Sequence, residues 1–156
     1  MSRIQLALNV SDLDEAIEFY SKFFKSEPAK VRAGYANFAI DEPPLKLVLI
    51  ENGGAPGSIN HLGVEVASTE EVIDATKYLG SVGFGTRIEE ATTCCYASQD
   101  KVWVDGIDGS PWEVYTVLAD APAETGVAGD GLCCVPEAAE RGSAVVGAAR
   151  AGSPCC

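Results

Sequence analysis

Six cysteines in this chain form three adjacent pairs: Cys94-Cys95, Cys133-Cys134 and Cys155-Cys156. Adjacent cysteines make poor disulfide partners, because bridging them closes a strained ring across one peptide bond. They can instead present two soft sulfur atoms to one thiophilic centre. Alternatively, the cysteines could simply pack as small hydrophobic residues. That would readily explain a single adjacent pair, but it explains less well why all six cysteines occur in pairs. The pattern therefore favours binding of a soft metal or metalloid.

The composition limits the class of partner. The chain has 156 residues, enough for one domain with a core, and 11 basic against 23 acidic residues give a formal charge of −12. Nucleic acid and anionic membrane surfaces would repel it, so we expect a small-molecule partner. No apolar run approaches the length of a membrane span, and a strand pattern begins almost at Met1. We therefore expect a cytoplasmic location in which the cysteines stay reduced.

Two parts of the chain repeat one arrangement. Residues 4–10 and 60–66 alternate apolar with small or polar residues, which predicts strands. Apolar residues at helical spacing follow each strand, so a helix is expected after each. Both helices begin with a capping-box pattern, Asp12 with Glu15 and Ser68 with Glu71.

Further strands are expected after each helix, at about residues 31–40 and 45–51 in the first half and 85–90, 95–104 and 112–118 in the second. The fold class is therefore α+β: two tandem βαβββ modules, residues 3–51 and 60–118, forming one curved mixed sheet within residues 1–118. Residues 119–156 are rich in Ala and Gly, lack aromatic residues and hold four cysteines. We expect them to be a mobile tail.

The repeat places metal-ligand types at related positions. His61, the only histidine, opens the second module's first strand at the position that Gln5 holds in the first. Glu113 lies in the last strand, aligned with Lys46. Paired modules would bring these positions together at the mouth of the sheet, although a lone histidine at a strand start is often only a polar end residue. A protonated lysine has no lone pair to give. Gln5, His61 and Glu113 would form a three-ligand site with open positions, a neutral-amide variant of the facial triad of non-haem Fe(II) oxygenases.

The repeat, these three positions and the segments Asn60–Val64 and Ser110–Tyr115 resemble the vicinal oxygen chelate superfamily, which holds glyoxalase I, extradiol dioxygenases and the bleomycin and fosfomycin resistance proteins. The resemblance covers residues 3–118. With Cys94-Cys95, Ser11-Asp12-Leu13 and Pro44-Leu45-Lys46-Leu47 added, the chain is similar to the Fe(II)-dependent carbon–arsenic lyases and the related cadmium-induced proteins.

This resemblance implies a mechanism. Fe(II) held by Gln5, His61 and Glu113 would activate O2, and oxygen insertion would cleave the C–As bond of a trivalent methyl- or aryl-arsenical. Cys94 and Cys95 would chelate the arsenic, and we expect them in an inserted substrate loop that closes over the metal. Tyr96 and Lys101 either line the site or belong to an exposed pair. Cys133, Cys134, Cys155 and Cys156 either pass arsenic on or scavenge metal.

Three alternatives compete with this interpretation. Glyoxalase I supplies four protein ligands, and Lys46 stands where the fourth is required. Drug-sequestering resistance proteins bind through aromatic clefts without metal chemistry. The serious rival is a cadmium- or arsenic-sequestering protein without turnover, because thiol pairs serve storage and catalysis equally well. The sequence favours a site built within one chain but does not decide between a monomer and a homodimer. It also does not decide between methyl and aromatic arsenicals as substrates.

Overall fold

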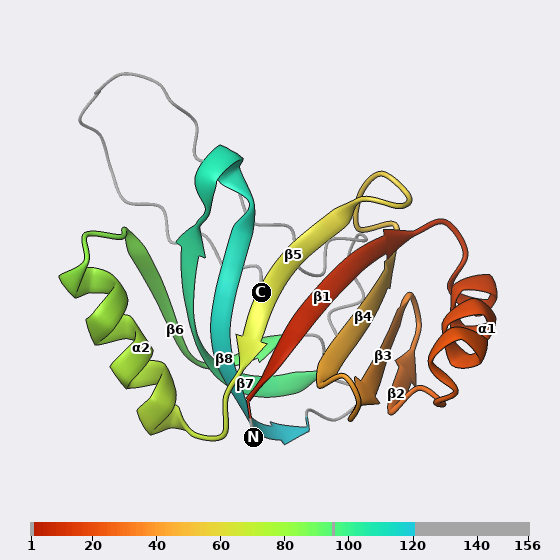
Figure 1. Ribbon diagram of the computed structural model, residues 1–156, viewed down its shortest axis with the longest axis horizontal. Helices are drawn as coiled ribbons and strands as arrows, with labels where there is room; N and C mark the ends of the chain where they lie inside the picture. The colour runs from red at the N-terminus through yellow and green to blue at the C-terminus, as the bar shows by residue number, and fades with distance from the viewer. Residues whose placement is uncertain (1, 95, 121–156) are drawn as a thin grey trace.

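The computed structural model describes residues 2–94 and 96–120, which form a single curved sheet with two helices (Figure 1). The elements are β1 (Arg3–Val10), α1 (Leu13–Phe24), β2 (Lys30–Arg32), β3 (Tyr35–Ile40), β4 (Leu45–Glu51), β5 (Ile59–Glu65), α2 (Thr69–Ser81), β6 (Thr86–Cys94), β7 (Ala97–Asp105), the short 3₁₀ helix η1 (Ile107–Gly109) and β8 (Pro111–Asp120). The strand order is β2-β3-β4-β1-β5-β8-β7-β6. The predicted fold of two modules in one curved mixed sheet is confirmed.

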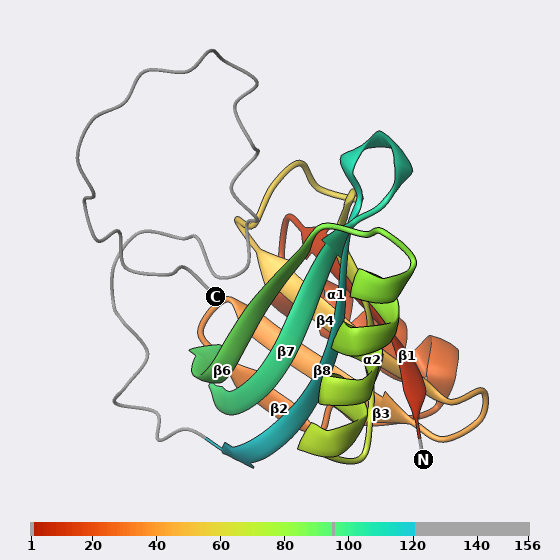
Figure 2. The ribbon, with the colours of Figure 1, turned by 90° about the vertical axis from the view of Figure 1, so that its left-hand side faces the viewer.

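The two modules meet along β1 and β5, which pair antiparallel at the centre of the sheet. Each central strand pairs in parallel with the last strand of its own module, β1 with β4 and β5 with β8. The outer strands continue the curve on both sides, so the sheet wraps around a concave face (Figures 1 and 2). This arrangement brings the starts of both modules to one place.

Both helices lie on the outer side of the sheet and begin where the capping patterns predict. The Asp12 carboxylate accepts a hydrogen bond from the Glu15 amide at 2.8 Å, and the Ser68 hydroxyl accepts one from the Glu71 amide at 3.4 Å. Leu13 of α1 belongs to an apolar cluster with Leu47 and Leu49 of β4, while alternate side chains of β1 pack against the same cluster. Because side chains of a strand alternate between faces, the remaining β1 residues point to the concave side.

The first half of the sheet contains one strand more than predicted. The segment expected as one strand over 31–40 is a hairpin, β2 and β3, with a turn at Ala33 and Gly34. Gly34 has φ +70°, a conformation that residues with a Cβ rarely adopt. The alternating pattern continues through this turn, which is why periodicity alone joined the two strands.

The segment before the first cysteine pair is strand rather than the expected loop. β6 extends to Cys94 and pairs with β7 in a long antiparallel hairpin, with Cys94 opposite Ala97 and a bulge between Glu89 and Thr92. Ala91 has φ 47° within this bulge, and its amide donates to the Asp100 carboxylate at 2.8 Å. The inserted residues therefore form regular structure up to the pair itself.

The predicted tail begins two residues too early, since Ala119 and Asp120 belong to β8 and pair with β7. The rest of that prediction, including Cys133-Cys134 and Cys155-Cys156, falls outside the described residues. Within residues 2–94 and 96–120, neither helix is long and apolar enough to cross a membrane.

Candidate metal centre

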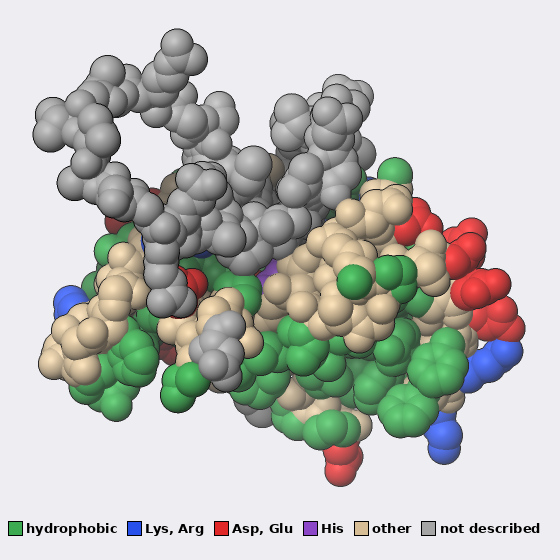
Figure 3. All heavy atoms as spheres, turned by 90° about the horizontal axis from the view of Figure 1, so that it is seen from above, with side chains coloured by type: hydrophobic (Ala, Val, Ile, Leu, Met, Phe, Trp, Pro, Cys, Tyr) green, Lys and Arg blue, Asp and Glu red, His purple; other side chains and the backbone are tan. Residues whose placement is uncertain are grey.

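The structure brings Gln5, His61 and Glu113 together on the concave face, one from each of β1, β5 and β8. All three side chains are buried, with 3–4 % of their surface exposed. The Gln5 amide nitrogen lies 3.0 Å from His61 Nε2 and 2.6 Å from Glu113 Oε1, and the last two atoms are 3.4 Å apart. Viewed from above, the one histidine side chain (purple) is visible between the two halves of the molecule (Figure 3).

Gly63 gives these side chains room to meet. It pairs with Gln5 across β1 and with Glu113 across β8, so it lies between two of the three donors. A Cβ atom at this position would lie 3.0 Å from Glu113 Cγ and 3.4 Å from the Gln5 side chain. A larger residue at position 63 would therefore have to displace the Glu113 side chain slightly. Gly63 lies in one of the sequence segments quoted above, but its sequence context did not indicate this role.

A chain of amides fixes the His61 ring. Asn60 donates to the Gly53 carbonyl at 3.3 Å, and a carbonyl only accepts, so the Asn60 oxygen must face His61. That oxygen lies 2.8 Å from His61 Nδ1, which therefore carries the ring proton. Asn9 extends the chain, accepting from Asn60 at 2.9 Å. The lone pair of His61 Nε2 is thereby directed at Gln5 and Glu113, the orientation that metal-ligating histidines need.

Lys101 secures the charge of Glu113. Its ammonium group lies 3.1 Å from Glu113 Oε2 and is almost wholly buried, with 1 % of the residue exposed. Burial alone would raise the pKa of Glu113, but the charge of Lys101 and its hydrogen bond to Oε2 act against burial and lower that pKa. Glu113 is therefore a carboxylate with Oε2 bonded to Lys101 and Oε1 facing Gln5 and His61.

Of the two residues expected beside the cysteine pair, Lys101 lies in the site and Tyr96 lies in a separate group of contacts. The Tyr96 ring packs edge-on against Tyr35 with centroids 5.9 Å apart, and Arg32 lies over its face. Lys30 donates to the Tyr96 carbonyl at 3.3 Å and pairs with Asp120. These contacts hold the end of the β6–β7 hairpin against β2 and β3.

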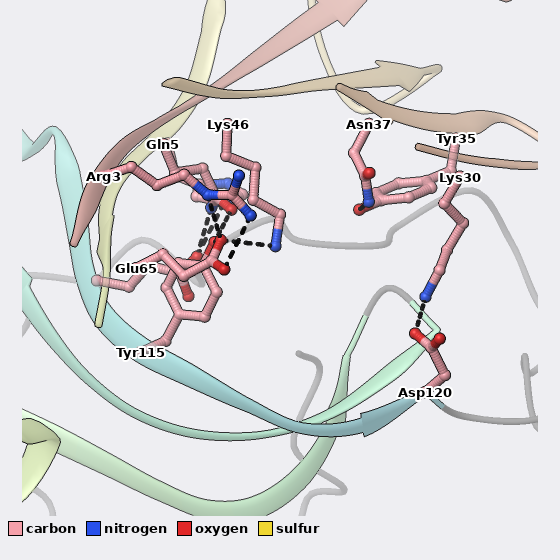
Figure 4. Close-up of polar contacts among 11 residues, drawn as sticks. Arg3, Gln5, Lys30, Tyr35, Asn37, Lys46, Glu65, Tyr115 and Asp120 are labelled. Carbon is pink, nitrogen blue, oxygen red and sulfur yellow. Dashed lines mark hydrogen bonds and ion pairs between the residues drawn. The ribbon is translucent and has the colours of Figure 1, made fainter. Parts of the chain in front are cut away.

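A second polar network lies behind Gln5, and the sequence analysis missed it. The Tyr115 hydroxyl is 2.5 Å from Gln5 Oε1 and 3.0 Å from Glu65 Oε2. Arg3 donates twice to Glu65, at 3.1 and 3.3 Å, and Lys46 lies 3.2 Å from the same carboxylate (Figure 4). Side chains alternate between the two faces of a strand, so Glu65 lies on the same face as His61 in β5, and Tyr115 on the same face as Glu113 in β8. This spacing was the only signal of the network that the sequence contained.

Both titratable partners in this network have shifted pKa values. Burial beside Glu65 and Glu113 raises the pKa of Tyr115 well above its usual value, so the hydroxyl stays protonated. Burial opposes ionisation of Glu65, but hydrogen bonds from Arg3 and the charge of Lys46 lower its pKa. The network therefore consists of a neutral phenol and an anionic carboxylate.

The strand register corrects the alignment of Lys46 with Glu113. Leu6 pairs with Leu47 in the first module, and Leu62 pairs with Trp112 in the second. The next residues, Val48 and Glu113, are therefore counterparts. Val48 is buried in an apolar cluster, so the symmetry-related position offers no ligand atom. The expectation of three donors rather than four remains, but the residue at the fourth position is valine.

The donor set fits a divalent cation of intermediate hardness. A carboxylate oxygen, an imidazole nitrogen and an amide converge in a buried site, and such mixed sets suit Fe(II) or Mn(II). In the described part of the chain, no three His, Cys, Asp or Glu side chains converge as a metal site, so Gln5 stays the predicted third ligand. Cys94 is described only as the end of β6, and its side chain and Cys95 fall outside the described residues. Their role as arsenic ligands stays a prediction.

The model of the glyoxalase/bleomycin resistance protein/dioxygenase superfamily matches residues 3–114. The chain belongs to this superfamily. A solved extradiol ring-cleaving dioxygenase from B. fuscum has the same fold, with a TM-score of 0.55, 19 % identity, and 78 % of this chain and 34 % of that one covered.

Two relatives in sequence are much nearer. The trivalent organoarsenical cleaving enzyme of Thermomonospora curvata is 54 % identical over 157 residues, covering 100 % of both chains. The cadmium-induced protein CadI of Mycobacterium tuberculosis is 61 % identical over 121 residues, which is 78 % of this chain and 80 % of that protein. The expected relationship to both groups is confirmed.

Proposed function

We propose that this chain is an Fe(II)-dependent dioxygenase that cleaves the C–As bond of trivalent organoarsenicals and releases arsenite. The observation that carries the proposal is the meeting of Gln5, His61 and Glu113 in one buried site within a single chain. The full-length similarity to an organoarsenical cleaving enzyme supports the choice of substrate.

Gln5, His61 and Glu113 would hold the iron, which when bound would supply the binding and activation of O2. Glu113 contributes the negative charge that a divalent cation needs, and Lys101 keeps one of its two oxygens engaged. Asn60 keeps the His61 ring turned toward the cation. Burial of the three donors excludes bulk water, which protects a reactive iron–oxygen chemistry from side reactions.

The cysteine pair would hold the arsenic. Trivalent arsenic is thiophilic, and two adjacent thiolates gain affinity because the second bond forms within the same complex. The β6–β7 hairpin leads directly to Cys94, and its end is held against β2 and β3 by Tyr96 and Lys30. Holding the arsenical in this way would fix its C–As bond relative to the activated oxygen.

The overall reaction balances without a further reductant. A methyl group leaving trivalent arsenic as formaldehyde loses four electrons, and one O2 accepts four. One oxygen atom goes to the aldehyde and the other to arsenic, which remains trivalent as arsenous acid. One O2 should therefore disappear for each arsenite that forms.

Sequestration of cadmium or arsenic without turnover is the second candidate, and the 61 % identity with a cadmium-induced protein favours it. It predicts that the cysteines alone determine function. The buried triad would then have no role, although Gly63 leaves room for its side chains and a buried lysine–carboxylate pair lies within it.

Two variants separate these functions. The Fe(II)-loaded protein is given trivalent methylarsenic and air, while arsenite formation and arsenic binding are measured separately. We expect His61→Ala to lose arsenite formation and keep arsenic binding, and Cys95→Ser to lose both. Arsenic binding without arsenite in the unsubstituted protein would support sequestration and overturn the lyase proposal.

A further inference from the structure

The Gln5 amide is turned the wrong way to bind a cation. Its NH2 group faces His61 Nε2 and Glu113 Oε1, and its oxygen faces the Tyr115 hydroxyl. An amide NH2 donates hydrogen bonds and has no lone pair for a metal. If Gln5 is a ligand, the amide must turn by half a rotation so that its oxygen faces the other two donors.

Tyr115 is the group that the turned amide would meet. Its hydroxyl lies within hydrogen-bond distance of both Gln5 Oε1 and Glu65 Oε2, but it has only one proton to donate. In the described orientation both neighbours are acceptors, so one of the two contacts is left without a proton. After the turn, the Gln5 NH2 donates to the Tyr115 oxygen, and the Tyr115 proton is free for Glu65.

Glu65 competes with Gln5 for the Tyr115 proton: the hydroxyl oxygen lies 2.5 Å from Gln5 Oε1 and 3.0 Å from Glu65 Oε2. Arg3 and Lys46 bind the same Glu65 carboxylate and keep it in place (Figure 4). A hydrogen bond to a carboxylate is stronger than one to a neutral amide oxygen. With its proton on Glu65, Tyr115 presents lone pairs to Gln5, and only the NH2 group can face them favourably.

We propose that Tyr115, anchored by Glu65, is a positioning residue that turns the oxygen of the Gln5 amide toward the bound cation. The inference rests on the proposed ligand set and adds a switch to it. Without a cation, the carboxylate of Glu113 at 2.6 Å attracts the NH2 group. A cation between the donors reverses this preference, and Tyr115 makes the reversed orientation the better hydrogen-bonded one.

The first test is the affinity of the full-length chain for Co(II), followed by its visible absorption under reducing conditions. Tyr115→Phe removes the hydroxyl without changing charge, and we expect about tenfold weaker Co(II) binding, as is usual when a hydrogen-bond partner of a ligand is lost. Tyr35→Phe is the matched control. Tyr35 is also buried, but its hydroxyl bonds to Asn37, so Co(II) binding should change less than about twofold.

The second test repeats the Tyr115 substitution in a Gln5→Glu background. A carboxylate presents an oxygen in either orientation, so it has no need of a positioning residue. We expect Tyr115→Phe to weaken Co(II) binding about tenfold with Gln5 and less than about twofold with the glutamate. An equal loss in both backgrounds would mean that Tyr115 acts through packing alone and would overturn the proposal.

Gln5→Ala separates failure of this inference from failure of the proposed function. Weaker Co(II) binding in Gln5→Ala with no change in Tyr115→Phe would leave the ligand set standing and overturn the positioning role. Unchanged Co(II) binding in Gln5→Ala would overturn the ligand set, and the positioning role with it.

Discussion

The two halves of the sheet have the same fold and opposite chemistry on the concave face. In the first half, Ala7, Tyr35, Val48 and Ile50 form a buried apolar cluster. In the second half, the counterparts of Ala7 and Val48 are Gly63 and Glu113, and a buried lysine lies beside them. The difference shows that the repeat supplies the frame, whereas a few residues in one copy make the buried polar cluster that we propose as a cation site.

The asymmetry also explains why we propose three protein ligands rather than four. Two central strands carry Gln5 and His61 as a related pair, but only the second module has a carboxylate, Glu113, at the position that Val48 holds in the last strand of the first. Val48 closes the fourth position with a side chain that binds no metal. A cation held from three sides retains open positions, which O2 chemistry needs.

The largest effect on metal affinity should follow loss of His61, the proposed ligand from β5. We expect His61→Ala to weaken Co(II) or Fe(II) binding by about 1,000-fold, more than the 10- to 100-fold typical of residues that only orient a ligand. Metal titration monitored by absorbance measures this. Asn37→Ala, whose side chain bonds to Tyr35, is the control and should leave the affinity unchanged; a similar loss there would contradict the assignment of His61 as a ligand.

The buried pair between Lys101 and Glu113 should matter most to the metal-free protein. Lys101→Met leaves a buried carboxylate without its cation, so we expect a loss of about 3 kcal/mol in the free energy of unfolding. Urea denaturation with and without Co(II) measures it. Added Co(II) should recover much of the loss, because the metal replaces the missing charge. Equal losses with and without Co(II) would argue against a cation at Glu113.

Orientation of the histidine ring should give a smaller effect. Asn60→Ala removes the acceptor for His61 Nδ1, and we expect about tenfold weaker metal binding. Isothermal titration with Co(II) provides the number, and far-UV circular dichroism checks that the fold is intact. Unchanged affinity in a folded variant would mean that the ring needs no such support.

The smallest effect on metal affinity should come from replacing Gly63 by alanine, the residue that its counterpart Ala7 provides in the first half. Gly63→Ala places a Cβ 3.0 Å from Glu113 Cγ. We expect about fivefold weaker metal binding from the displaced carboxylate. Gly85→Ala, where a Cβ would meet no atom within 4 Å, is the control. If both variants bind metal equally well, Gly63 is not needed for the approach of the donors.

Local patterns in the sequence were enough to predict the frame. The capping residues Asp12 and Ser68 placed both helix starts, and strand alternation placed the central strands. The repeat then predicted that Gln5, His61 and Glu113 would approach one another. These features depend on neighbouring residues and on one symmetry relation, so a single sequence contains them.

What the sequence did not supply depends on contacts between distant residues. The register of β8 against β5 makes Val48 the counterpart of Glu113, whereas the sequence repeat had aligned Lys46 with it. The turn at Gly34 was missed for a local reason, because the strand pattern of residues 31–40 continues through it. Lys101 was expected beside the cysteines, but its burial against Glu113 follows from strand pairing. The Tyr115–Glu65 network involves two strands and needed the sheet order to be seen.

The central claim is that this chain turns over an organoarsenical rather than storing it. The most direct measurement counts arsenite formed and O2 consumed per chain when the Fe(II)-loaded protein receives excess trivalent methylarsenic. We expect many arsenite molecules per chain, one O2 consumed for each, and no arsenite without Fe(II) or O2. Arsenic bound at a fixed ratio to the chain, with no arsenite and no O2 uptake, would contradict it.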